Sequence, residues 1–131
     1  MFGSMNYSVK RIRQRFLKAL RSGDYTKGRT KLIQEDEGGN TTYCVLGVLY
    51  TISPVKPEHL EGIYDAADTL LGVPKIGNML WMMNDDTIQF SGVEYTFKDI
   101  ADTLEEGLFS QYPAKQTWRE WMNELFTFNG L

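Results

Sequence analysis

The feature that most constrains the fold is an apolar run in the middle of the chain, residues 43–50, which read Tyr-Cys-Val-Leu-Gly-Val-Leu-Tyr. A run of this composition has to be buried, but its length suits a buried strand or a short helix equally well. We favour a strand up to about residue 42 or 43, followed by a buried helix over Cys44–Ile52. Thr41 and Thr42 can cap that helix, and Ser53-Pro54 stops its pattern.

The residues before this run predict an amphipathic helix. Ser8 can cap its first turn, and Gly23 can end it in the left-handed conformation that glycine adopts most readily. Between the two, apolar residues recur at steps of three and four, the period of one helix face. They are Val9, Ile12, Phe16, Leu17 and Leu20.

Two short β segments are expected. Residues 29–34 and 40–44 flank an acidic, glycine-containing turn at 36–39, which predicts a hairpin. Residues 87–95, around Gly92, are a weaker second β segment.

Three more helices are expected. The first covers Glu58–Leu71 and ends at Gly72 and Pro74. The second begins at Thr96, where Asp99 stands in the position of a capping box. The third begins at Thr117 and is rich in aromatic residues.

The whole chain, residues 1–131, is expected to form one mainly helical α+β domain with about five helices and one or two short β-hairpins. Its hydrophobic content of 42% is enough to fold without disulfides. Residues 1–6 are expected to be disordered or to have been added to the native sequence, and residues 110–131 to form an aromatic C-terminal helix. Because no apolar run approaches twenty residues, we expect a soluble cytoplasmic protein without a membrane contact.

Charge is divided unevenly along the chain. The first 31 residues hold nine of the fourteen lysines and arginines and one of the seventeen acids, a charge of about +8, which leaves about −11 for the rest. The basic segment, with Arg29, is a candidate nucleic-acid surface. We favour the alternative that these cations form a solvated face or pair with the acidic body.

The sequence contains few residues that could carry out catalysis. One cysteine and one histidine cannot supply a disulfide or an ordinary zinc site, and no metal or other cofactor is predicted. Cys44, at the expected start of a helix, is a candidate nucleophile with His59 or Asp85 as its partner. Burial among apolar neighbours is the interpretation that we favour for this cysteine. For the segment Asn84-Asp85-Asp86 we favour a helix-ending turn over a cation site.

Four blocks of sequence carry a resemblance. They are Ala-Leu-Arg-Ser-Gly-Asp-Tyr at 19–25, Tyr-Cys-Val-Leu-Gly-Val-Leu at 43–49, Met-Asn-Asp at 83–85, and Tyr-Thr-Phe-Lys-Asp-Ile-Ala-Asp at 95–102. In order and spacing the chain resembles, over about residues 12–108, an uncharacterised family of small bacteriophage and prophage proteins. Val45 and Met83 stand where that pattern usually has a second cysteine and a leucine. The resemblance implies a phage origin and no particular reaction.

These features favour a phage-encoded accessory protein that acts in the host cytoplasm by binding a host protein or a small ligand, and that is not an enzyme. A cysteine-dependent hydrolase or transferase and a nucleic-acid binder are the alternatives, and homo-oligomerisation stays open. The candidate binding residues are Arg21, Arg29, Tyr43, Asn84 and Asp85. Trp118 and Trp121, in the expected C-terminal helix, are candidates for a partner or dimer contact.

Overall fold

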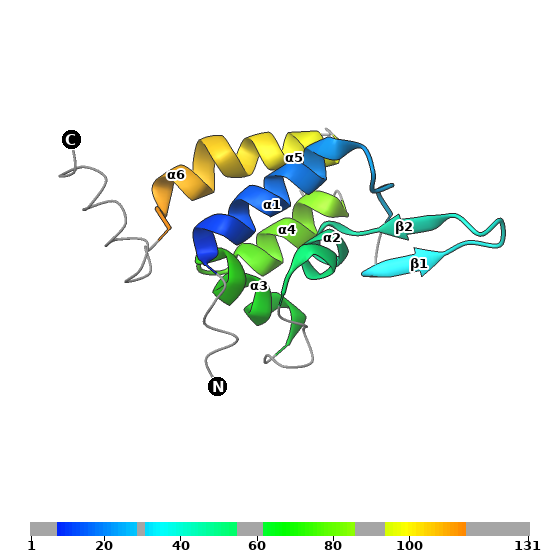
Figure 1. Ribbon diagram of the computed structural model, residues 1–131, viewed down its shortest axis with the longest axis horizontal. Helices are drawn as coiled ribbons and strands as arrows, with labels where there is room; N and C mark the ends of the chain where they lie inside the picture. Colours follow the sequence, from blue (N-terminus) through cyan, green and yellow to red (C-terminus); the bar gives the residue numbers. More distant parts are fainter. Residues whose placement is uncertain (1–7, 29–30, 55–61, 86–93, 115–131) are drawn as a thin grey trace, which may run out of the picture.

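A computed structural model describes residues 8–28, 31–54, 62–85 and 94–114 of the chain (Figure 1). These residues form five helices and one two-stranded antiparallel hairpin, which confirms the predicted mainly helical α+β class. None of the helices in these ranges is long and apolar enough to cross a membrane.

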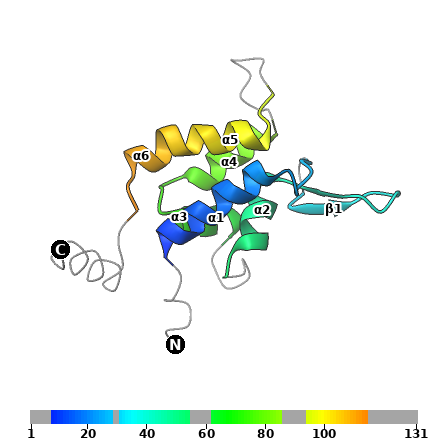
Figure 2. The ribbon, with the colours of Figure 1, turned by 45° about the horizontal axis from the view of Figure 1, so that its top comes forward.

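Helix α1 (Val9–Ser22) has the ends that the sequence predicts. The Ser8 hydroxyl accepts a hydrogen bond from the Arg11 backbone N–H at 3.1 Å, and Gly23 ends the helix with φ of 81°. The apolar face packs on helices α2, α3 and α5, so α1 lies in the middle of the helical body (Figure 2). Phe16 is completely buried there.

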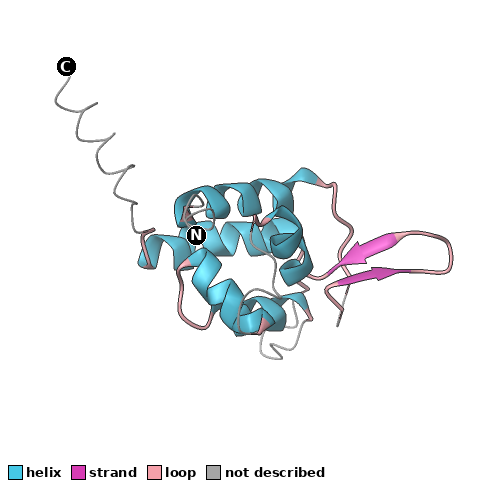
Figure 3. Ribbon diagram, turned by 60° about the horizontal axis from the view of Figure 1, so that its bottom comes forward, coloured by secondary structure: helices cyan, strands magenta, loops and turns pink. Residues whose placement is uncertain are grey.

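The hairpin consists of β1 (Ile33–Glu35) and β2 (Thr41–Tyr43), with Ile33 opposite Tyr43. Asp36 organises the turn, because one carboxylate oxygen accepts the backbone N–H groups of Gly38 and Asn40, each at 2.9 Å. Figure 3 shows the hairpin projecting from the helical body.

Helix α2 (Val45–Ile52) confirms the predicted buried helix, but the prediction of its cap was wrong. Thr41 and Thr42 belong to β2, and Cys44 caps the helix by accepting the Gly47 N–H at 3.4 Å. A Cβ atom on Gly47 would lie 1.9 Å from the Leu32 carbonyl oxygen. The glycine therefore lets the base of the hairpin lie directly against α2.

Helix α3 (Ile63–Leu71) is shorter than predicted. It begins at Ile63, because Gly62 has φ of 70° and ψ of 151°, which no helical residue adopts; the predicted start at Glu58 lies outside the described residues. Its predicted end is confirmed at Gly72. Helix α4 (Ile76–Asn84) follows and packs on α3.

The last described helix is continuous through three labelled parts: α5 (Phe97–Thr103), η3 (Leu104–Leu108) and α6 (Phe109–Gln111). Thr96 and Asp99 form the predicted capping box. Residues 1–6, most of the predicted β segment at 87–95 and the predicted helix after Thr117 lie outside the described residues; 94 and 95 are not in a strand.

Candidate functional site

A groove of about 460 Å³ lies where the end of α1 meets the start of α5. One wall is the last turn of α1, with Arg21, and the chain that follows it, with Tyr25 and Lys27. The other wall is the segment that enters α5, with Tyr95 and Lys98 among its residues. The first and last of the four sequence blocks thus meet at one groove.

The first wall is held by the hairpin. The Tyr43 backbone N–H donates to the Thr26 carbonyl at 2.8 Å, and its carbonyl accepts the Gly28 N–H at 2.7 Å. The Tyr43 ring packs edge to face on Tyr25, with the ring centroids 5.0 Å apart. Tyr43 therefore lies behind the wall and fixes Tyr25 in it.

Asn84 joins this wall to two helices. Its side-chain oxygen accepts the Val45 backbone N–H, and its amide group donates to the Gly28 carbonyl and to the Asp85 carboxylate, each at 2.9 Å. The residue is completely buried. Asn84 thus ends α4, caps α2 and anchors the wall at Gly28, and it is not on the groove surface.

Asp85 follows Asn84 as the C-cap residue of α4, where its backbone N–H donates to the Trp81 carbonyl at 3.0 Å. The helix-ending role predicted for this segment is confirmed at both residues.

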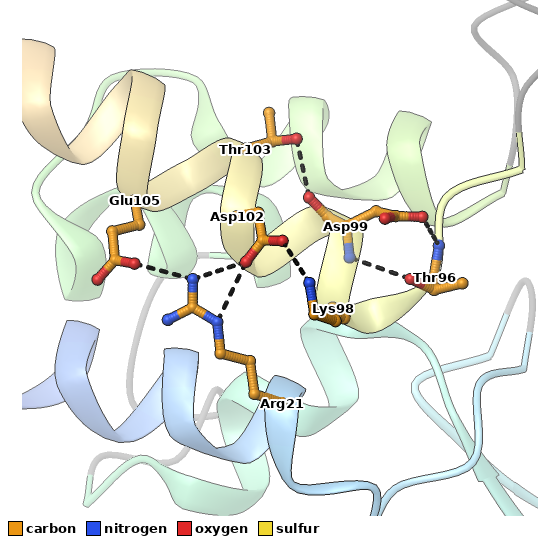
Figure 4. A network of polar contacts seen from close by, with 7 residues as sticks. All are labelled: Arg21, Thr96, Lys98, Asp99, Asp102, Thr103 and Glu105. Atoms are coloured by element: carbon orange, nitrogen blue, oxygen red, sulfur yellow. Dashed lines mark hydrogen bonds and ion pairs between the residues drawn. The ribbon is translucent and has the colours of Figure 1, made fainter.

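Charged groups pair across α1 and α5 beside the groove (Figure 4). Arg21 donates to Asp102 at 2.8 Å and to Glu105 at 2.9 Å, while Lys98 donates to the second oxygen of Asp102 at 2.8 Å. The hydrogen bonds with Asp102 and then Glu105 raise the pKa of Arg21. Hydrogen bonds from Lys98 and then Arg21 lower the pKa of Asp102. These groups are partly or fully exposed, so each pair alone stabilises the fold weakly.

Lys27 links the two walls, because its ammonium group donates to the Tyr95 carbonyl. The lining contains three cations, Arg21, Lys27 and Lys98, and one acid, Glu94. Tyr25, Lys27 and Tyr95 were not among the predicted binding residues. The two tyrosines could have been identified as candidates from the sequence, because they belong to the first and last of the four sequence blocks.

Arg13 is not a surface cation, although it belongs to the basic segment. Its side chain is buried, with Nε donating to the Leu71 carbonyl at 2.7 Å, and its guanidinium lies 4.5 Å from the centre of the Phe109 ring. A weaker bond reaches the Gly72 carbonyl at 3.4 Å. Burial lowers the pKa of Arg13. This arginine therefore caps the C-terminal end of α3.

The Cys44 side chain is buried at the start of α2. Burial raises the pKa of the Cys44 thiol, and the charge of Asp85 adds to this effect. This environment favours the neutral thiol over the nucleophilic thiolate.

The other predicted site residues, His59, Arg29, Trp118 and Trp121, lie outside the described residues. Within the described ranges no three histidine, cysteine or acidic side chains gather in a way that could hold a metal ion.

Comparison with known proteins gives one match. Residues 8–65 match the model of a family described as a domain of unknown function (DUF8296). No curated protein and no solved structure matches the chain. The matched residues include α1, the hairpin and α2, and they stop before the wall formed by Tyr95 and Lys98. Over these residues the chain is therefore similar to an uncharacterised domain family, and the other half of the groove lies beyond the match.

Proposed function

We propose that this protein is a phage-encoded accessory protein that acts by binding a small ligand in the groove between α1 and α5. The observation that carries the proposal is the convergence of the sequence blocks. The blocks at 19–25 and 95–102 line the groove, while Tyr43 and Asn84 of the other two blocks support its wall from behind. The phage origin rests on the resemblance carried by these same blocks.

The size and chemistry of the groove favour a small ligand. A volume of about 460 Å³ is within the range of small-molecule sites. The walls combine aromatic rings at Tyr25 and Tyr95 with the N–H donors of Arg21, Lys27 and Lys98, of which Arg21 and Lys98 also pair with Asp102 and Glu105 at the edge of the groove. A planar molecule with a carboxylate or another acceptor group suits such a lining, because the rings can stack on it and the cations can donate to it.

Binding is a better proposal than catalysis for this chain. The Cys44 thiol is buried and its raised pKa disfavours the thiolate. In the groove, Lys27 donates to the Tyr95 carbonyl and Arg21 donates to Asp102 and Glu105. Two cations held in this way are better suited to position a ligand than to transfer protons.

Native mass spectrometry of the protein recovered from expressing cells tests the proposal directly. We expect an additional mass of a few hundred daltons that is lost on denaturation. The same wild-type protein should show saturation transfer to benzoate by NMR, used as a planar anionic probe. Lys27→Ala should weaken that signal several-fold, whereas Lys18→Ala, a change of an exposed lysine on α1 outside the groove, should leave it unchanged.

A bare protein that gives no transfer to benzoate would argue against a small ligand. Host proteins recovered by pull-down would then become the class of partner to examine.

A second candidate function is nucleic-acid binding, which the exposed face of α1 supports. Arg11, Arg15 and Lys18 are exposed at helical spacing, and no described residue forms an ion pair with them. Three phosphate contacts predict that the logarithm of the affinity falls with the logarithm of salt concentration with a slope of about −3. Fluorescence anisotropy with a labelled DNA duplex between 50 and 200 mM salt measures that slope. Binding that Arg11→Ala and Arg15→Ala leave unchanged would exclude this face.

A further inference from the structure

The outer edge of β1 presents backbone groups without partners among the described residues. Cys44 N–H donates to the Leu32 carbonyl at 3.0 Å, and Asp36 N–H donates to the Asn40 carbonyl at 2.9 Å. Backbone groups in an antiparallel strand alternate in direction, so residues 32, 34 and 36 face β2. Ile33 and Glu35 therefore direct their N–H and C=O groups away from the hairpin.

This edge is open to solvent. All three residues of β1 are exposed, and Ile33 at 52% is the most exposed large hydrophobic residue in the part of the chain that the structure describes. The hairpin also projects from the helices (Figures 1 and 3), so a second strand can approach β1 without meeting the helical body. An exposed apolar side chain on a free strand edge is an arrangement that favours pairing with another strand.

The charged residues along this edge are complementary to those of a second, antiparallel copy of the same strand. Lys31 stands two residues before Ile33, and Glu35 stands two residues after it. Both side chains are exposed, and neither has an ion-pair partner in the described part of the chain. A strand that ran antiparallel and centred on Ile33 would need an acid opposite Lys31 and a base opposite Glu35. A second copy of the same strand supplies both.

We propose that two copies of this protein dimerise through β1, with Ile33 opposite Ile33 of the second copy. The outward backbone groups of the two Ile33 residues pair with each other. Because residues directly opposite in an antiparallel pair lie on the same face, each Lys31 meets the Glu35 of the other copy beside the isoleucine pair. The two hairpins together form a four-stranded sheet.

The contact is short, so the dimer is expected to be weak and to depend on concentration. A standard stable interface buries about 1,200–2,000 Å² in total, more than a three-residue edge provides. Opposite charges at the two ends fix the register, because a shift by two residues removes both Lys31–Glu35 ion pairs and the isoleucine contact.

Sedimentation equilibrium of the full chain up to about 1 mM tests the dimer. The wild type should dimerise, whereas Lys31→Glu and Glu35→Lys alone should each weaken association at least tenfold, because each places like charges opposite each other twice. The double variant restores both ion pairs and should dimerise again. A mixture of the two single variants should form a heterodimer for the same reason.

A matched control variant and a hydrogen-exchange measurement test whether association occurs at the outer edge of β1. Glu106→Lys makes the same charge change as Glu35→Lys on an exposed residue of η3 and should leave association unchanged. Hydrogen exchange should slow with concentration at the Ile33 and Glu35 amides, while the Gln34 amide is protected at all concentrations. A wild type that stays monomeric at 1 mM, or single variants that associate as the wild type does, would overturn the proposal.

Discussion

Asn84 and Val45 are joined by a 2.9 Å hydrogen bond across 39 positions of sequence. Because the amide group of Asn84 also donates to the Gly28 carbonyl, one buried side chain connects the end of α4, the start of α2 and the wall of the groove. The geometry of the groove thus depends on a residue that no ligand in the groove would touch.

Asn84→Ala should lower the free energy of unfolding by about 2–4 kcal/mol, since it leaves a buried and a partly buried backbone group, the Val45 N–H and the Gly28 carbonyl, without this partner. Asn84→Asp retains the acceptor for Val45 and loses the donors, so it should also destabilise the protein. Urea unfolding measures the change. Asn78→Ala, an exposed asparagine on the same helix, is the control and should stay within about 0.5 kcal/mol of the wild type. Equal stabilities for the Asn84 and Asn78 variants would show that the hydrogen bonds of Asn84 do not stabilise the fold.

Arg13→Met should destabilise the protein by about 2–3 kcal/mol, because it removes the donors to the end of α3 while it keeps an apolar side chain of similar length. Arg13→Lys should restore little of this loss, since an ammonium group cannot reproduce the planar contact with Phe109. Thermal unfolding followed by circular dichroism makes the comparison. Arg15→Met, two residues further along on the exposed face of α1, should have almost no effect. A full rescue by lysine would contradict the role given to the guanidinium group.

The ion pairs of Asp102 should make a contribution to stability that depends on pH. Hydrogen bonds from Lys98 and then Arg21 hold the pKa of Asp102 below its ordinary value of 3.8. A lowered pKa in the folded state means that the contribution is present above pH 3.8 and is lost as the pH falls through the folded value.

We therefore expect Asp102→Asn to be less stable than the wild type at pH 7 and to approach it as the pH falls below the lowered pKa of Asp102. The difference at pH 7 should also shrink as salt is added, since the groups are exposed. Urea unfolding at a series of pH values tests this expectation, with Glu106→Gln as the control. A difference that is constant from pH 7 to pH 2 would rule out the ion pairs as its cause.

Cys44 should react slowly with iodoacetamide in the folded protein at pH 8 and rapidly in urea. Burial keeps the thiol away from the reagent and raises its pKa, so both accessibility and thiolate fraction are low. We expect the rate to rise by about two orders of magnitude on unfolding. Mass spectrometry of samples quenched over time gives both rates. Fast alkylation of the folded protein near neutral pH would instead return Cys44 to the list of candidate nucleophiles.

Local signals account for what was predictable from the sequence. Ser8 and Gly23 mark the ends of α1, and Thr96 with Asp99 marks the start of α5, because each cap acts within one turn of its own helix. The buried helix at 45–52 was also predictable, since its composition alone requires burial. Its cap was not, because pairing of β2 with β1 takes up the threonines that could have served.

Contacts between distant residues decided the rest. Arg13 lies in a run of cations that all look alike in the sequence, and only the position of Leu71, 58 residues away, makes it a buried cap. Arg21 meets Asp102 across 81 residues, and Asn84 meets Gly28 across 56. The sequence by itself therefore determined both ends of α1, the start of α5 and the burial of α2, whose signals are local. The tertiary structure decided which polar side chains are buried and which line the groove, because burial and hydrogen bonding depend on partners that only folding brings near.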